Sequence, residues 1–259
     1  MSTPIFRFAP SPNGFLHIGH AYSALLNQKM AEEAGGRLLL RIEDTDQTRS
    51  RPEFVNAIFE DLAWLGIGWE EPVRIQSEHF ADYAGNLERL WAKGAVYPCF
   101  CSRKLAQANA LASHDPDGQQ HYGGTCRNLP REDARRRIAD RVAHGWRLDT
   151  SGDPQAAGWG DVMISRPLVG SSYHIAVVTD DALQAVTHIV RGRDIEAATP
   201  VHMLLQKLLG YPVPCYLHHD LILDDAGEKL SKSRNSRSLR MLRAEGITAR
   251  DIRKRLGFA

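Results

Sequence analysis

The stretch Arg7–His20, RFAPSPNGFLHIGH, decides the fold of this chain. A short apolar strand is expected around Ile5–Phe8, followed by a turn rich in proline, asparagine and glycine. The stretch ends at His17-Ile18-Gly19-His20, and apolar residues at helical spacing then predict a helix from about Ala21 to Ala34. Both histidines are therefore expected at a strand-to-helix junction, where backbone N–H groups and the helix dipole favour an anion. Gly19 leaves space beside the backbone, so the junction is typical of a nucleotide phosphate site.

Two further segments place polar side chains at the ends of predicted strands. The apolar run Arg37–Ile42 leads into Glu43-Asp44-Thr45-Asp46, and open α/β sheets bind ligands at such strand ends. A solvated acidic turn is the alternative for these carboxylates. Further on, Ile175–Thr179 is predicted as a strand, and Ala185–Val190 as a second strand that runs into Arg191.

Smaller signals predict the elements between and after these strands. Ser50-Arg51-Pro52-Glu53 has the spacing of a capping box, and a helix is expected from it. A helix is also expected at Thr199–Leu209 and a last short strand at Leu221–Leu223. Cys215 lies in an apolar segment and is expected to be buried.

Three of the four cysteines lie close together in the sequence, at Cys99, Cys101 and Cys126. Structural zinc sites have four ligands, most often thiolates and imidazoles, so the three thiols would supply most of a site. Glycines before Cys126 allow a tight knuckle, and His121 is a candidate for the fourth ligand. Three free cysteines packed as small apolar residues are the alternative.

Composition and charge fit an ordinary globular enzyme. The 259 residues include 43% hydrophobic and 24% charged residues, with a net charge of +1, so any nucleic-acid contact must come from a local patch. Arg131–Arg141 is rich in arginine on a predicted helix, which indicates either a solvated face or contact with an RNA backbone. The N-terminus lacks the features of a secretory signal, and no apolar run approaches a membrane span. We therefore expect a monomeric cytoplasmic protein with no membrane partner.

The HIGH motif at His17–His20 is followed far downstream by Lys229-Leu230-Ser231-Lys232-Ser233, KLSKS. In this order the two motifs resemble a class I aminoacyl-tRNA synthetase. The flanking segments LLLRIEDTD (38–46), YHIAVVTDD (173–181) and THIVRGRD (187–194) narrow the resemblance to the catalytic half of a glutamyl-tRNA synthetase, over nearly the whole chain. It implies an α/β, Rossmann-like catalytic domain with a parallel sheet, formed by residues 1–75 and 178–224. An inserted zinc-bearing α+β domain at 76–177 and a KLSKS loop with a short helical tail at 225–259 would complete it.

The resemblance also implies roles for residues at the matching positions. The implied catalytic residues are His17, His20 and Lys232. ATP would contact Pro10, His17, Gly19, His20, Lys229, Ser231 and Lys232. Glutamate would contact Arg7, Ala9, Ser11, Glu43, Tyr173 and Arg191. A guanidinium suits the side-chain carboxylate of glutamate because it binds carboxylates bidentately, although an ion pair between Arg191 and Asp194 is the structural alternative. Arg193 and Thr179 depart from the family pattern beside these positions.

A complete glutamyl-tRNA synthetase continues beyond KLSKS into a helical anticodon-binding domain, whereas this chain ends at Ala259. In this respect it resembles the queuosine-modifying relatives of the family, in which a tyrosine that maps to Tyr122 joins Cys99, Cys101 and Cys126 as a ligand of one structural Zn²⁺. The resemblance implies that ATP, with Mg²⁺, activates L-glutamate to glutamyl-adenylate without tRNA. The glutamyl group would then pass to the queuosine base in the anticodon loop of tRNA(Asp).

Three other functions remain open at this point. The chain could be a truncated glutamyl-tRNA synthetase that charges tRNA(Glu), a nucleotidyltransferase with an HxGH motif, or an inactive paralogue that only binds tRNA. The intact motif residues favour an active enzyme, and the ordered glutamate-site segments argue against a nucleotidyltransferase acting on a small molecule.

Overall fold

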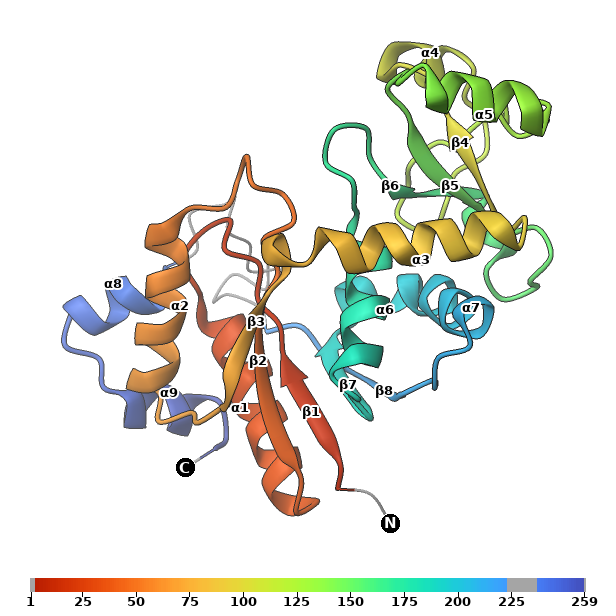
Figure 1. Cartoon of the computed structure of the whole chain (residues 1–259). Coiled ribbons are helices and arrows are strands. Elements are labelled where there is room, and N and C mark those ends of the chain that lie inside the picture. The colour runs from red at the N-terminus through yellow and green to blue at the C-terminus, as the bar shows by residue number, and fades with distance from the viewer. Residues whose placement is uncertain (1–2, 223–236, 259) are drawn as a thin grey trace. The chain divides into compact units, whose positions relative to one another are not determined.

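The structure is a computed structural model that describes residues 3–222 and 237–258 (Figure 1). Contacts divide the chain into two compact units. The first unit comprises Met1–Glu78, Ala185–Glu196 and Pro214–Ala259, and the second comprises His79–Gln184 and Ala197–Val213. The domain limits at residues 75, 177 and 224, which the family resemblance implies, stay a prediction.

A five-stranded parallel sheet with the strand order β3-β2-β1-β7-β8 forms the centre of the first unit. Its strands are β1 (Ile5–Phe8), β2 (Arg37–Ile42), β3 (Glu70–Ile75), β7 (His188–Gly192) and β8 (Cys215–His219). Its helices are α1 (Ile18–Glu33), α2 (Pro52–Trp64), α8 (Leu239–Ala244) and α9 (Ala249–Arg255). This arrangement confirms the predicted α/β class with a parallel sheet. The strand order reverses between β1 and β7, where sheets of this kind bind ligands.

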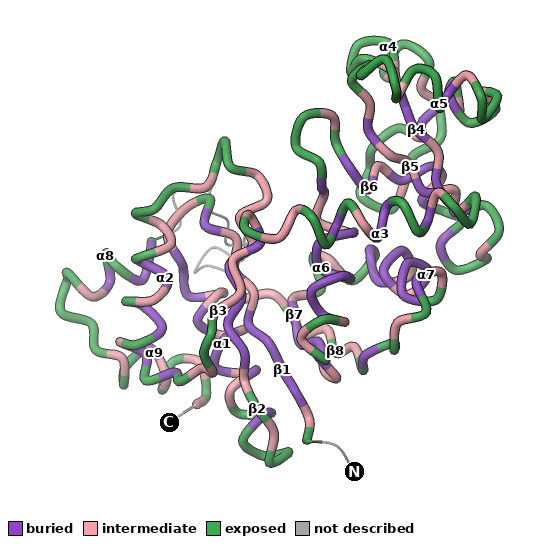
Figure 2. The backbone as a smooth tube through the Cα atoms, viewed as in Figure 1, coloured by how far each residue is buried: buried purple, intermediate pink, exposed green. Residues whose placement is uncertain are grey.

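The two faces of this sheet differ in character. Phe6 packs with Ala31 of α1 and Val190, while Phe8 joins the apolar cluster formed by α1, α2 and the C-terminal helices. Ile5 points to the other face, where it packs with Leu39. Figure 2 shows β1 buried along its length. Since strand residues alternate between faces, Arg7 lies on the face of Ile5.

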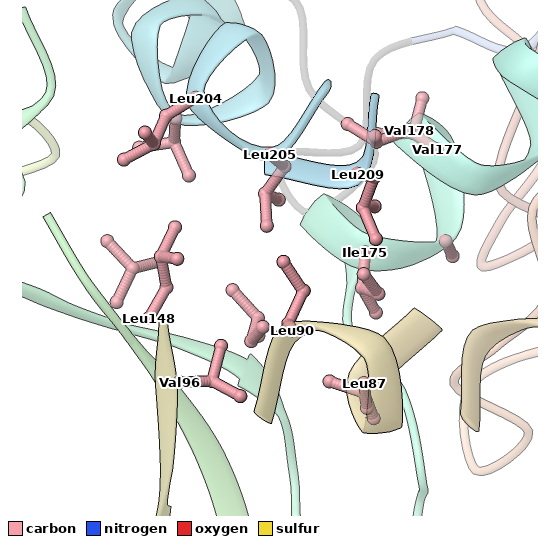
Figure 3. Close-up of a cluster of buried hydrophobic side chains, with 14 of the residues drawn as sticks. Leu87, Leu90, Val96, Leu148, Ile175, Val177, Val178, Leu204, Leu205 and Leu209 are labelled. Atoms are coloured by element: carbon pink, nitrogen blue, oxygen red, sulfur yellow. The ribbon is translucent and has the colours of Figure 1, made fainter. Parts of the chain in front are cut away.

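The second unit combines a three-stranded antiparallel sheet, in the order β4-β5-β6, with five helices among its described residues. Its strands are β4 (Val96–Cys99), β5 (Gly145–Asp149) and β6 (Asp161–Ser165). Its helices are α3 (Phe80–Ala92), α4 (Arg103–Ala108), α5 (Arg131–Ala139), α6 (Tyr173–Leu183) and α7 (Thr199–Leu209). Figure 3 shows the core of this unit, where Leu87 and Leu90 of α3 meet Ile175 of α6 and Leu205 of α7.

The main error of the sequence prediction concerns α6. Ile175–Thr179 was predicted as a strand, but it lies inside a helix that is buried from Ile175 to Asp181. A short apolar run rich in valine fits a buried helix as well as a strand, and packing decides between them. The carboxylate of Asp180, predicted in a turn, accepts a hydrogen bond from the Tyr83 hydroxyl at 3.0 Å within the core.

Three smaller predictions are also wrong. Arg51, and not Ser50, caps α2, and its side chain makes no capping hydrogen bond, so there is no capping box. Among the described residues the last strand is β8, and Leu221 and Ile222, which follow it, lie in no strand, while Leu223 lies outside the described residues. Cys215 is exposed because it begins β8 at the edge of the sheet. In the described ranges, no helix combines the length and the apolar character that crossing a membrane requires.

Candidate active site

The HIGH motif forms the N-terminus of α1, three residues earlier than the predicted helix start. His17 is the N-cap, and its Nδ1 accepts a hydrogen bond from the Gly19 N–H at 3.2 Å. The Nδ1 of His20 accepts one from the His17 N–H at 3.1 Å, and the two ring centroids lie 3.8 Å apart. Because Nδ1 accepts in each ring, the neutral imidazoles carry their proton on Nε2 and donate from that atom.

Gly19 makes room for the His17 ring. A Cβ at position 19 would lie 3.1 Å from Cε1 of that ring, which is tighter than ordinary contact. The structure thus assigns Gly19 a role in seating the histidine cap, whereas its predicted contact with ATP stays a prediction. Pro10 is buried in the preceding turn and accepts a hydrogen bond from the Glu43 N–H at 3.1 Å, which ties the turn to the end of β2.

The HIGH motif is also joined to the C-terminal helices. His17 forms an antiparallel bridge with Ser238, and the Leu239 N–H donates to the Leu16 carbonyl at 2.8 Å. The Ser238 side chain caps α8. The predicted ATP contacts Lys229, Ser231 and Lys232 lie outside the described residues.

Three buried arginines lie on one face of the sheet, near the carboxyl ends of its central strands. Arg7 in β1, Arg41 in β2 and Arg191 in β7 are 4%, 0% and 5% exposed. Arg7 pairs in register with Leu39, which packs with Ile5, so Arg7 lies on the face of Ile5. Arg41 follows Leu39 by two residues in β2 and therefore lies on the same face. Arg191 follows Ile189 by two residues, and Ile189 packs on Ile5, so Arg191 shares this face. Arg41 was not among the predicted site residues.

Glu43 is held beside these guanidinium groups. Its Oε1 accepts from Nη2 of Arg41 at 3.1 Å and from Nε at 3.3 Å, and both side chains are buried. A carboxylate accepts hydrogen bonds from cations, so Glu43 has the chemistry to bind an ammonium group. Ala9 and Ser11 follow β1 at the carboxyl end of that strand, and their predicted contact with glutamate stays a prediction.

Arg191 has partners on β8. Its Nε donates to Nε2 of His218 at 3.2 Å, and its guanidinium lies 5.2 Å from the centre of the Tyr216 ring. Burial lowers the pKa of His218, and the neighbouring Arg191 charge lowers it further. A neutral His218 can accept from Arg191 and orient its guanidinium. His218 was not among the predicted site residues, because the last strand was predicted at Leu221–Leu223 and not at β8.

Tyr173 is the first residue of α6 in the second unit. Its ring centroid lies 5.4 Å from that of His202 and 5.8 Å from that of His174. These two histidines share a hydrogen bond of 3.1 Å between Nδ1 of His174 and Nε2 of His202. The assignment of Tyr173 to glutamate stays a prediction.

The second unit brings the predicted metal ligands together. The Sγ atoms of Cys99, Cys101 and Cys126 all lie within 4.8 Å of one another. The Tyr122 hydroxyl oxygen lies 3.2 Å from Sγ of Cys101 and 3.6 Å from Sγ of Cys99, and it accepts from the Cys126 N–H at 3.0 Å. Three soft sulfur donors and one oxygen around a common centre fit the donor set and coordination number of Zn²⁺.

His121, the competing candidate, is engaged elsewhere. Its Nδ1 lies 2.9 Å from the Ser113 hydroxyl, and its Nε2 lies 3.0 Å from the carbonyl oxygen of Gly158. Both ring nitrogens therefore have partners outside the thiol cluster. This geometry favours Tyr122 as the fourth ligand.

Arg147 lies beside the thiol cluster and contacts two of its residues. The guanidinium of Arg147 lies 3.7 Å from the centre of the Tyr122 ring, and its Nε donates to Sγ of Cys99 at 3.5 Å. Burial acts to raise the pKa of Cys99, but hydrogen bonds from Arg147 and Tyr122 outweigh it, so the net pKa is lowered. Burial raises the pKa of Cys101 to about 11, and the neighbouring thiols add to this effect. Metal binding, which requires thiolates, would therefore release protons.

Comparisons with known proteins agree with this geometry. A family model described as tRNA synthetases class I (E and Q), catalytic domain, matches residues 5–256. The chain therefore belongs to the class I tRNA synthetase family and is a ligase of the aminoacyl-tRNA synthetase type, with a function like that of glutamate–tRNA ligases. The resemblance inferred from the sequence motifs is confirmed.

Individual proteins of this family are similar to the chain over most of its length. A Rhodobacter capsulatus protein named glutamyl-Q tRNA(Asp) synthetase is 45% identical, over 98% of this chain and 100% of that protein. A Geobacter sulfurreducens protein named glutamate–tRNA ligase is 38% identical, over 95% of this chain but 55% of that protein. The solved glutamate–tRNA synthetase from Elizabethkingia anophelis has a TM-score of 0.77 at 24% identity, over 90% of this chain and 53% of that one, and shows the shared fold.

Proposed function

We propose that the chain activates L-glutamate with ATP to glutamyl-adenylate, without tRNA, and transfers the glutamyl group to the queuosine base of tRNA(Asp). The proposed binding of glutamate is supported by the group of buried arginines Arg7, Arg41 and Arg191 on one face of the sheet. Guanidinium groups bind carboxylates through charge-assisted hydrogen bonds, often two at a time, and glutamate brings two carboxylates. Glu43, beside them, supplies an acceptor for the ammonium group.

In the activation step, an oxygen of the glutamate α-carboxylate attacks the α-phosphorus of ATP. The bond to the bridging oxygen breaks, and pyrophosphate leaves with that electron pair. The Nε2–H groups of His17 and His20 donate to the phosphate oxygens, where negative charge develops. Mg²⁺ would neutralise charge on the departing pyrophosphate.

Lys229, Ser231 and Lys232 are proposed to contact the phosphates from the KLSKS segment. Lys232 precedes Ser238 by only a few residues, and Ser238 pairs with His17. The role of Lys232 rests on the family resemblance, because this residue lies outside the described residues. Its work would be electrostatic, as is that of the histidines.

In the transfer step, a hydroxyl of the queuosine cyclopentenediol attacks the glutamyl carbonyl. An ester forms, AMP leaves with the electrons of the anhydride bond, and the proton of the hydroxyl is released to solvent. The full-length similarity to a protein named glutamyl-Q tRNA(Asp) synthetase supports this acceptor.

A zinc ion would be held by Cys99, Cys101, Tyr122 and Cys126 and would serve only to fix the local fold. The glycines beside Tyr122 show how tightly the chain turns there. A Cβ at Gly123 would lie 1.9 Å from the carbonyl oxygen of Asn109, and Gly124 has a φ of +76°. Only glycine tolerates both positions.

The nearest alternative is charging of tRNA(Glu), because relatives named glutamate–tRNA ligase are also similar. The test is glutamate-dependent ATP–pyrophosphate exchange without tRNA, followed by transfer of labelled glutamate to tRNA(Asp) with and without queuosine. Exchange together with transfer only to the queuosine-containing tRNA is expected. Label at the 3′ end of tRNA(Glu) would instead establish the alternative.

A matched pair of variants tests the glutamate site in the same assay. Arg191→Gln should raise the KM for glutamate at least tenfold, since a buried charged hydrogen bond is worth about 1.5–3 kcal/mol. Arg193→Gln, two residues later and 60% exposed, is the control and should change little. Equal effects of both variants would refute the assignment of Arg191.

A further inference from the structure

A row of half-buried aromatic rings lies beside helix α5 in the second unit. The ring centroids lie 5.2 Å apart for Trp91 and Trp146, 5.4 Å for Trp146 and His144, and 5.4 Å for His144 and Phe100. The row thus runs continuously from the end of α3 to the segment that follows β4. Figure 2 shows α5 exposed over most of its surface.

Three arginines of α5 hold their guanidinium groups over the two ends of this row. Arg131 and Arg135 lie 5.3 and 6.0 Å from the centre of the Trp91 ring, and Arg137 lies 5.4 Å from that of Phe100. Nη2 of Arg131 also donates to the Trp91 carbonyl at 2.8 Å. We name these side chains the basic aromatic strip, which consists of Trp91, Phe100, Arg131, Arg135, Arg137, His144 and Trp146.

The charges of the strip are not neutralised. Within the described residues, no carboxylate forms an ion pair with any of its three arginines. Arg136, on the same helix, pairs with Asp133 at 2.6 Å and lies over no ring. Helical spacing explains the contrast, because the strip arginines flank the buried Ala134 while Arg136 faces the opposite side. The chain thus gathers unpaired positive charge here despite a net charge of only +1.

We propose that the basic aromatic strip binds single-stranded RNA, with bases stacking on the guanidinium planes and rings and phosphates accepting from the arginine N–H groups. This inference rests on the proposed tRNA-dependent function and names a surface for the RNA. Single-stranded loops are recognised by stacking on aromatic side chains and arginine planes, combined with backbone charge. The rings restrain the arginines before binding, so less side-chain entropy is lost when RNA binds.

The test compares the affinity of the full chain for tRNA(Asp) across a salt series. The double variant Arg135→Gln/Arg137→Gln should bind at least fivefold more weakly. The slope of log K against log salt should fall in magnitude by about 1.4, because each phosphate contact with a single strand contributes about 0.7. Arg136→Gln is the matched control and should retain the wild-type affinity. The variant Arg135→Lys/Arg137→Lys should keep the salt slope but lose affinity, since lysine keeps the charge without the planar stacking group.

The same preparations are assayed for ATP–pyrophosphate exchange without tRNA, which these substitutions should leave unchanged. Wild-type affinity in the double glutamine variant would overturn the inference while leaving the proposed function intact, and would leave the strip as a docking site for an acidic protein. Failure of the wild-type chain to bind tRNA, with exchange present, would refute the proposed acceptor and the inference together. An equal loss of tRNA affinity in the Arg136→Gln control would mean that any positive charge on α5 contributes equally. It would contradict a specific role of the basic aromatic strip.

Discussion

Asp61 gives the first unit a pH-dependent stability that a single substitution should remove. This α2 residue is 0% exposed, and neither carboxylate oxygen has a hydrogen-bond partner among the described residues. Nη2 of Arg243 lies 3.8 Å from Oδ1. Burial raises the pKa of Asp61 to about 6, against an opposing effect of the Arg243 charge.

The sign follows from the two protonation states. Below its ordinary pKa, near 3.8, Asp61 is protonated in both the folded and the unfolded chain. Between about pH 4 and 6 the folded chain binds more protons, so the free energy of unfolding falls as the pH rises. A shift of about two units at 1.4 kcal/mol each gives a total loss of about 3 kcal/mol. About 2 kcal/mol of this loss falls between pH 4.5 and 7.5.

Asp61→Asn removes the titration and keeps the size of the side chain. Urea unfolding, followed by tryptophan fluorescence, should show the variant gaining about 2 kcal/mol relative to wild type between pH 4.5 and 7.5. The control is Glu60→Gln, since Glu60 contacts the same Arg243 but is 62% exposed, and its pH effect should stay below about 1 kcal/mol. A stability difference between Asp61→Asn and wild type that does not vary with pH would refute the reasoning.

Three further predictions concern the two candidate sites. Tyr122→Phe should weaken zinc binding at least tenfold in a chelator competition, whereas His121→Ala should not, and the reverse order would identify His121 as the ligand. Arg41→Gln should raise the KM for glutamate in pyrophosphate exchange by about tenfold and leave that for ATP unchanged, and an effect on ATP alone would contradict its place at the carboxylates. Gly123→Ala should lower unfolding stability by about 2–3 kcal/mol, while Gly158→Ala, whose Cβ meets nothing within 4 Å, should change it little in the same denaturation assay.

The first part of the sheet could be predicted because its signals are local. The turn residues after β1, the apolar run of β2 and the helical spacing after His20 each act within a few residues. Ser11 and Glu43, two of the predicted glutamate contacts, consequently lie just beyond the carboxyl ends of β1 and β2. The family resemblance could be predicted as well, because it depends only on the motifs and their order along the chain.

The errors arose where packing, and not the local sequence, decides the outcome. The valines of α6 favour a strand by propensity, but residues 175–178 are buried in the core of the second unit as part of a helix. Arg41 lies within the apolar run of β2 and was not among the predicted site residues. Only the register of β1 with β2 shows that it shares a face with Arg7. The preference for Tyr122 over His121 likewise depends on the contacts of His121 with Ser113 and Gly158, which local sequence signals do not predict.

The HIGH motif shows why a phosphate site can also be a structural element. His17 and His20 each use Nδ1 to accept a backbone N–H at the start of α1, as a capping serine or aspartate would. Aspartate in the same place would bring negative charge to the proposed phosphate site, and serine would not extend past the cap. Histidine accepts through one nitrogen and donates through the other, on the far side of a rigid ring. The spacing of the two histidines therefore follows from helix capping, and the proposed phosphate contacts would explain their identity, since histidine can also donate to an anion beyond the cap.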